Sequence, residues 1–219
     1  MRTDCPISPF SRYVLKPLCP LFKRLFRLLL GIKAEGQENI PKKGAYIIAA
    51  NHRSYLDPPV IASVFPEPVF FVAKEELFRN KIFSIFLKHL AAIPIKRGGL
   101  DKEALRRSMK VLEAECRLCI FPEGRRADKG RFEKPKAGVG LLAIKSGVMV
   151  LPVYIEGTDE AMPKEAKVPR FFNKIRVIIG KPVRYRKEEI CEEDPYQWVA
   201  EDIMRRIREL SESEKTSVA

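Results

Sequence analysis

The fold is decided by the stretch AYIIAANHRSYLDPP, residues 45–59. Residues 45–50 form an apolar, β-prone run, and His52, one of only two histidines in the chain, lies just after its C-terminal end. Asp57 follows and directly precedes Pro58. Aspartate is a good helix N-cap, and proline is favoured at the first helical position. The pattern therefore predicts a strand, a short loop and a helix that Asp57 caps.

The spacing of His52 and Asp57 permits two interpretations. Neighbouring side chains on a helix are three or four residues apart, so a helix would not bring these two together. A tight turn between the strand end and the cap would, and an imidazole held in one tautomer by a carboxylate can act as a general base. In the other interpretation, Asp57 only caps the helix and His52 is an ordinary loop residue. Spacing alone leaves both open.

The rest of the chain alternates strand-like and helix-like segments. Further strands are expected at residues 69–72, 93–95, 118–121, 148–155 and 174–179, the last as an edge strand. Helices are expected at residues 57–64, 80–90, 101–115, 138–145 and 197–210. This alternation predicts an α/β fold with a mixed, largely parallel sheet flanked by helices. In such sheets, sites gather at the carboxyl ends of strands.

Length and charge limit the classes of protein to consider. The 219 residues suffice for one domain, which we place at residues 36–219, with a smaller segment at 1–35. The net charge of +13 indicates a polyanionic partner: nucleic acid, an anionic membrane surface or a phosphate-bearing substrate. Nucleic acid is disfavoured because the aromatic residues lie in apolar runs rather than among basic ones. A non-enzymatic basic domain remains the alternative from another class.

The N-terminal segment contains the apolar and basic run PLCPLFKRLFRLLL, residues 17–30. It is shorter than the ~20 apolar residues that a spanning helix needs. On a helix that begins near Pro20, the basic residues Lys23, Arg24 and Arg27 share one narrow arc and apolar side chains fill the rest. This predicts an amphipathic helix in a membrane interface, with the three cations facing anionic headgroups. The alternative is a helix packed on the domain core.

The cysteine pattern indicates the compartment. Five cysteines are an odd number, and charges interrupt the N-terminal apolar run, so we expect no secretory signal and a reducing, cytosolic compartment. Cys116 and Cys119 have a spacing found in metal and redox sites, but no second pair or nearby histidine completes a site. We interpret both as buried structural thiols.

A second group of polar residues follows the strand expected at 118–121. Glu123 and Gly124 precede the paired arginines Arg125 and Arg126. Glycine lets a backbone approach a ligand closely, and arginines offer forked donors for phosphate oxygens. The alternative is a solvated turn with two surface arginines. Two further cations follow other expected strands: Lys74 and Arg97. Each is placed to reach the same anion, and the alternative is that each is an ordinary surface cation.

Together these residues resemble the signature blocks of the glycerophospholipid acyltransferases, the lysophosphatidate acyltransferase family. Asn51-His52-x-x-x-x-Asp57 is similar to the first block, and Lys74-x-Glu76-Leu77 together with residues 93–97 is similar to the second. Residues 121–126 and 151–155 resemble the third and fourth. One departure is Arg125, which stands where the family usually has threonine or serine.

The resemblance implies a role for each of these residues. His52 would deprotonate the hydroxyl of a glycerophosphate-type acceptor, which attacks an acyl thioester directly, and Asp57 would orient His52 and stabilise its protonated form. Glu123, Gly124 and Arg126 would bind the glycerol-phosphate part of the acceptor. Three more cations would assist them: Arg97, Lys74 and Arg125.

The resemblance also implies the substrates and the location. The expected acceptor is the sn-2 hydroxyl of lysophosphatidic acid, with phosphatidic acid as the product, and the alternatives are glycerol 3-phosphate or another lysophospholipid. The donor would be acyl-CoA or an acyl-carrier protein, and no metal or bound cofactor is needed. We expect a peripheral or monotopic enzyme of the cell membrane, with its active site facing the cytoplasm.

Overall fold

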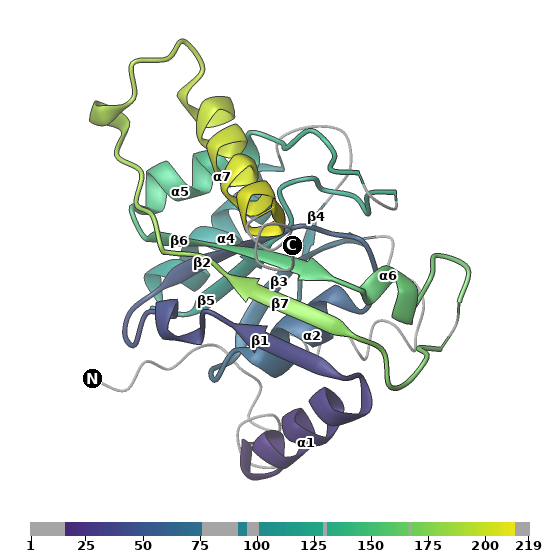
Figure 1. Ribbon diagram of the computed structural model, residues 1–219. Coiled ribbons are helices and arrows are strands. Elements are labelled where there is room, and N and C mark those ends of the chain that lie inside the picture. The colour runs from purple at the N-terminus through teal and green to yellow at the C-terminus, as the bar shows by residue number, and fades with distance from the viewer. Residues whose placement is uncertain (1–15, 76–91, 96–100, 129–130, 167, 213–219) are drawn as a thin grey trace.

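The computed structural model describes residues 16–75, 92–95, 101–128, 131–166 and 168–212. Its centre is a seven-stranded sheet in the order β1-β7-β6-β2-β5-β3-β4 (Figure 1). The strands are β1 (Ile32–Glu35), β2 (Tyr46–Ala50), β3 (Val69–Lys74), β4 (Ala92–Ile95), β5 (Arg117–Ile120), β6 (Met149–Glu156) and β7 (Ile175–Ile179). The helices are α1 (Lys16–Leu29), α2 (Asp57–Val64), α4 (Lys102–Glu113), α5 (Gly138–Ser146), α6 (Thr158–Ala161) and α7 (Pro195–Glu212).

The strand directions confirm a mixed, largely parallel sheet. Within the described sheet, β6 and β7 pair antiparallel and all other neighbours pair parallel. The central strand β2 lies between β5 and β6 and is buried along its whole length. Its continuous apolar sequence is typical of a strand that is covered on both faces.

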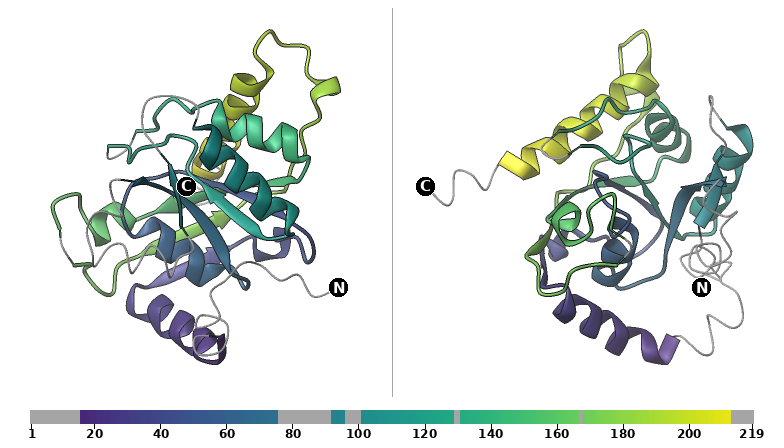
Figure 2. Two further views of the ribbon diagram at one scale, coloured as in Figure 1. Left: turned by 180° about the vertical axis from the view of Figure 1, so that it is seen from behind. Right: turned by 90° about the vertical axis from the view of Figure 1, so that its right-hand side faces the viewer.

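Helices cover both faces of the sheet (Figure 2). Alternate residues of a strand point to opposite faces, and β2 follows this rule. Ile47 and Ala49 join a core with α4, α5 and α7, whereas the remaining β2 residues pack with α2 on the other face. The sheet is therefore the middle layer of three, and β2 contributes to both cores.

The edge of the sheet differs from the prediction. The strand expected at 174–179 is β7, but it lies between β1 and β6 rather than at an edge. The edge position belongs to β1 (Ile32–Glu35), which the sequence analysis had placed in the N-terminal segment and which pairs with β7. That pairing joins residues 32–35 to the sheet through main-chain hydrogen bonds. The helix expected at 80–90 lies outside the described residues.

The cysteines confirm one prediction and contradict another. Cys119 is a buried free thiol, and burial raises its pKa well above the usual value. Cys116 is also buried, but it is disulfide-bonded, so the prediction of a thiol there is wrong. Sequence spacing carries no information about how cysteines pair.

Helix α1 begins four residues before Pro20, at Lys16. Proline lacks the N–H that would bond to the first helical carbonyl, so only that one hydrogen bond is lost. The helix packs against α2, and the Nζ of Lys23 donates to the carbonyl oxygen of Phe65 at 2.6 Å. The expectation that Lys23 faces headgroups together with the two arginines is therefore wrong. Among the described helices, none combines the length and the apolar character needed to cross a membrane.

Candidate active site

The site forms where β2 and β5 end side by side. The two strands are parallel and in register, with Ala49 opposite Ile120, so the loops that follow them meet at one edge of the sheet. The carbonyl oxygen of His52 accepts the backbone N–H of Ala127 at 2.8 Å. The histidine block and the glycine–arginine block, far apart in sequence, are thus joined through their main chains.

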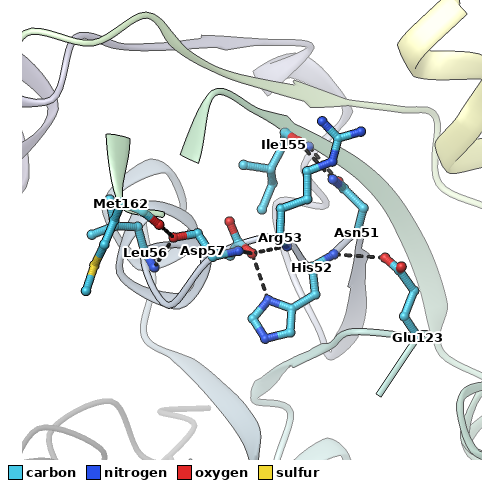
Figure 3. A network of polar contacts seen from close by, with 9 residues as sticks. Asn51, His52, Arg53, Leu56, Asp57, Glu123, Ile155 and Met162 are labelled. Atoms are coloured by element: carbon cyan, nitrogen blue, oxygen red, sulfur yellow. Dashed lines mark hydrogen bonds and ion pairs between the residues drawn. The ribbon is translucent and has the colours of Figure 1, made fainter. Parts of the chain in front are cut away.

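Asn51 fixes the end of β2 to its other neighbour, β6. Its amide group is buried, donates to the carbonyl oxygen of Ile155 at 2.8 Å and accepts the N–H of Ile155 at 2.7 Å (Figure 3). The side chain thus continues the ladder of the sheet by one step after the strand has ended. This anchor sets the position at which the chain turns toward His52.

Asp57 lies beside His52, as the first interpretation of the spacing predicted. Its Oδ2 atom is 2.7 Å from Nδ1 of His52 (Figure 3). The same oxygen accepts the backbone N–H groups of Arg53 at 2.7 Å and Ser54 at 2.8 Å. Asp57 is fully buried and is the first residue of α2, with Leu56 at the cap position and no capping bond from a side chain. The predicted cap is therefore wrong, because the carboxylate turns back to close the loop instead.

This arrangement fixes the tautomer and the orientation of the imidazole. An oxygen that receives two N–H groups acts as an acceptor toward the ring, so Nδ1 of His52 carries the proton and Nε2 keeps its lone pair. The ring of Phe121 stacks on the imidazole at a centroid distance of 4.1 Å and an angle of 18°. The His52 side chain is 16% exposed, so solvent and small molecules reach only part of the ring.

Glu123 is a buried residue that links the backbones of the two site loops by hydrogen bonds. Its Oε1 accepts the N–H of His52 at 3.0 Å, and its Oε2 accepts the N–H of Glu133 at 2.8 Å. The residue is buried, and burial raises the pKa of its carboxyl group although the two N–H donors lower it. Both oxygens are occupied by backbone donors, and the direct substrate contact predicted for Glu123 stays a prediction.

Gly124 adopts a left-handed backbone with φ of +65°. A Cβ atom at this position would lie 3.0 Å from Cε and 3.3 Å from Nζ of Lys136. Glycine therefore provides both the turn and the room for a cation to cross the loop. Lys136 is not predicted as a site residue by the sequence pattern, because its approach to Gly124 depends on the tertiary fold.

The two arginines differ in their surroundings. Arg125 is 65% exposed and forms an ion pair with Glu133. Arg126 is half-buried, and its guanidinium lies over the ring of Tyr55 at 3.8 Å from the centroid, a distance that suits a cation–π contact. Tyr55 belongs to the loop between His52 and Asp57, so Arg126 is held against the histidine block while Arg125 is exposed.

Of the two remaining predicted cations, the structure describes the position of only one. Lys74 is the last residue of β3, two strands away from β2, and Arg97 lies outside the described residues. Conversely, Phe121 and Asn51 contribute to the site although neither was expected to be a site residue. Their sequence signal was weak, since an aromatic and an amide at strand ends are common.

Fold and site define an α/β protein with a histidine–aspartate pair for acid–base chemistry at the carboxyl edge of its sheet. The chain belongs to the acyltransferase family, whose family profile, described as Acyltransferase, matches residues 31–156. This range includes both site loops and the strands that carry them.

The relatives are consistent with this assignment. A 1-acyl-sn-glycerol-3-phosphate acyltransferase of Pseudomonas aeruginosa is 32% identical over 80% of this chain and 70% of its own length. The chloroplastic enzyme of that name from Arabidopsis thaliana is 29% identical over 78% of this chain. The chain spans about half the length of that plastid protein and of one from Brassica napus.

A solved structure also matches. The crystal structure of the 1-acyl-sn-glycerophosphate acyltransferase PlsC from Thermotoga maritima aligns with a TM-score of 0.72 and 30% identity. The alignment covers 93% of this chain and 81% of that one. The fold of this chain is therefore similar to that of a solved member of the family.

Proposed function

We propose that the protein transfers a fatty acyl group to the sn-2 hydroxyl of 1-acylglycerol 3-phosphate and so produces phosphatidic acid. The observation that carries this proposal is the 2.7 Å contact between Nδ1 of His52 and Oδ2 of Asp57 beside the arginine loop. This arrangement brings a histidine that can act as a base next to a loop that can bind an anion. The names of the relatives favour this acceptor over glycerol 3-phosphate or another lysophospholipid.

The chemistry needs one proton acceptor and one leaving group. Nε2 of His52 takes the proton of the sn-2 hydroxyl as its oxygen attacks the thioester carbonyl, and the carbon–sulfur bond then breaks. The thiolate of the donor, acyl-CoA or an acyl-carrier protein, leaves and recovers the proton from the imidazolium. Asp57 stabilises that imidazolium while it exists. The step uses neither a metal nor a bound cofactor.

The acceptor's phosphate is bound by the arginine loop in this proposal. Arg126 is the primary contact, and Gly124 lets the backbone and Lys136 come close to the anion. Lys74, Arg97 and Arg125 supply further positive charge. Glu123 acts by holding the backbone of His52 in place. A direct contact of its carboxylate with the glycerol part would require one of its two backbone bonds to break.

We further propose that α1 attaches the enzyme to an anionic membrane as a peripheral or monotopic protein. The support is the orientation of the helix: Leu21, Phe22 and Leu28 are each at least 68% exposed, whereas Lys23 points to the protein. An ordinary surface helix buries its apolar side. We place the active site on the cytoplasmic side of that membrane. Nucleic acid is not a partner in this proposal.

A thiol-release assay tests the function directly. With acyl-CoA as donor, we expect release of free thiol that depends on lysophosphatidic acid and exceeds that with glycerol 3-phosphate or lysophosphatidylcholine by at least about 10-fold. Glycerol 3-phosphate leaves the acyl site empty, and the phosphodiester of lysophosphatidylcholine presents less negative charge to the arginine loop. Either loss costs on the order of 1.4 kcal/mol or more. Acyl-carrier protein donors are compared in parallel. No acceptor-dependent release with any donor would favour the non-enzymatic alternative.

Replacing the two arginines one at a time tests the binding site. We expect Arg126→Ala to raise KM for lysophosphatidic acid by about 10- to 100-fold, because a charge-assisted hydrogen bond contributes about 1.5–3 kcal/mol. Arg125→Ala is the matched control, with a change of no more than about threefold, because its side chain is exposed and paired with Glu133. Equal effects of the two substitutions on KM would refute the assignment of Arg126 as the primary contact.

A further inference from the structure

The loop between α6 and β7 carries two aromatic side chains that point away from the core. Phe171 is 58% exposed. Phe172 is 79% exposed, which is the largest value among the large apolar side chains of the described residues. Two consecutive exposed phenylalanines cannot be explained by packing within the domain. Exposed apolar groups that gather on one surface mark an interaction site.

The backbone of Phe172 is strained as well. Its φ of +59° lies in the left-handed region, which bulky residues other than glycine rarely adopt. Such strain persists where the surrounding structure imposes it, and it concentrates at functional positions. The side chain of Phe172 is exposed, so its burial does not offset the cost of the unfavourable backbone conformation.

A main-chain hydrogen bond and a close backbone contact hold this pair of aromatics at the end of α1. The N–H of Phe172 donates to the carbonyl oxygen of Leu29 at 2.7 Å. A Cβ atom on Gly31 would lie only 2.0 Å from the carbonyl oxygen of Asn173, so the two backbones are in close contact. Figure 1 and the left view of Figure 2 both place the loop beside the C-terminal end of α1.

We give the name docking face to the exposed apolar residues of α1 together with the two phenylalanines of the loop. Its members are Leu21, Phe22, Leu25, Leu28, Phe171 and Phe172. Exposed basic residues accompany it, with Arg24 on the helix and Arg170 and Lys174 on either side of the two phenylalanines. Aromatic and aliphatic groups flanked by cations suit the interface of an anionic bilayer.

The same loop is also attached to the active site. The carbonyl oxygen of Met162 accepts the hydroxyl group of Ser54 at 2.8 Å, and Ser54 belongs to the loop that Asp57 closes. The N–H of Arg170 donates to the carbonyl oxygen of Ala161 at 2.7 Å and closes the base of the loop. The loop therefore links the catalytic block to α1.

We propose that Phe171 and Phe172 are a second membrane-inserting element, which together with α1 fixes how the enzyme sits on an anionic bilayer. This inference rests on the membrane attachment proposed for α1. With two points of insertion, one helix and one loop, rotation of the domain on the membrane is restricted. The active-site loop is then held at a constant height above the lipid that supplies its acceptor.

Vesicle binding by full-length variants tests the proposal. With vesicles of equal parts phosphatidylglycerol and phosphatidylcholine, we expect the double variant Phe171→Ser/Phe172→Ser to bind at least about 10-fold more weakly. The variant lacks the two phenyl groups whose transfer from water into the bilayer favours binding. Trp198→Ser is the matched control, since it removes a partly exposed aromatic from α7, away from the docking face. Its binding should be unchanged.

Phe172→Gly separates membrane binding from folding. Glycine accepts a positive φ, so the melting temperature should stay the same or rise while vesicle binding falls. A purely structural role would lower the melting temperature instead. In a Trp198→Phe background, Phe172→Trp makes residue 172 the single tryptophan, and its emission should shift to shorter wavelength when vesicles are added.

The outcomes distinguish the two proposals. If Leu21→Ser/Phe22→Ser weakens binding and Phe171→Ser/Phe172→Ser does not, α1 attaches the protein and the second element is refuted. If neither variant weakens binding, both proposals fail, while lysophosphatidate-dependent thiol release still tests the reaction separately. If the loop variant alters only the oligomeric state in sedimentation experiments, the loop contacts a second copy of the chain and the inference is overturned.

Discussion

His52→Ala is expected to lower the rate of lysophosphatidate-dependent thiol release by about 10³- to 10⁴-fold, at the upper end of what general-base catalysis contributes. In the proposed mechanism, His52 is the only group that accepts the proton of the acceptor hydroxyl. His52 is held by Asp57 on one edge and by Phe121 on one face, so water in the emptied space would not reproduce its orientation. The measurement is kcat from initial rates at saturating donor and acceptor.

His52→Asn is the matched control for the fold. Its amide group can still donate to Oδ2 of Asp57, so the loop keeps all three hydrogen bonds to that oxygen, but an amide cannot accept the proton. We expect both variants to keep the far-ultraviolet circular dichroism spectrum and the KM for lysophosphatidic acid within about threefold. Wild-type turnover in either variant would remove the general base from the mechanism.

Asp57→Asn is expected to lower kcat by about 10²- to 10⁴-fold while the fold is retained. The amide oxygen can take the place of Oδ2 and accept the same three N–H groups. The amide nitrogen then occupies the position of Oδ1, which is buried and receives no hydrogen bond from the described residues. The substitution thus removes the negative charge that stabilises the imidazolium and leaves most of the geometry in place.

Asp57→Ala should differ from Asp57→Asn in stability. It leaves the imidazole and two backbone N–H groups without their acceptor, and we expect a loss of about 2–4 kcal/mol in the free energy of unfolding. Urea denaturation of the two variants measures this difference. Equal stabilities would show that Asp57 does not organise the loop, and full activity of Asp57→Asn would show that its charge does not assist His52.

Much of this fold follows from local sequence pattern. The alternation of apolar strands and amphipathic helices led to the mixed, largely parallel sheet, because periodicity reports which face of an element is buried. The helix expected at 101–115 is α4, which begins after Asp101 because the side chain of Asp101 accepts the N–H groups of Glu103 and Ala104 at 3.0 Å each. The edge was harder to predict. The strand β1 is short and charged, and it exists because β7 offers it main-chain partners.

By itself, the sequence determined which residue types stand at the ends of β2 and β5: a histidine and an aspartate in one loop, a glutamate, a glycine and two arginines in the other. Only the tertiary structure decided what each does there. The register of β2 with β5 brought the two loops together, which turned Glu123 to the backbone of His52, stacked Phe121 on the imidazole and separated Arg126 from Arg125. The physical reason is that a hydrogen bond or a ring contact depends on distance and direction across the sheet, and a linear pattern encodes neither.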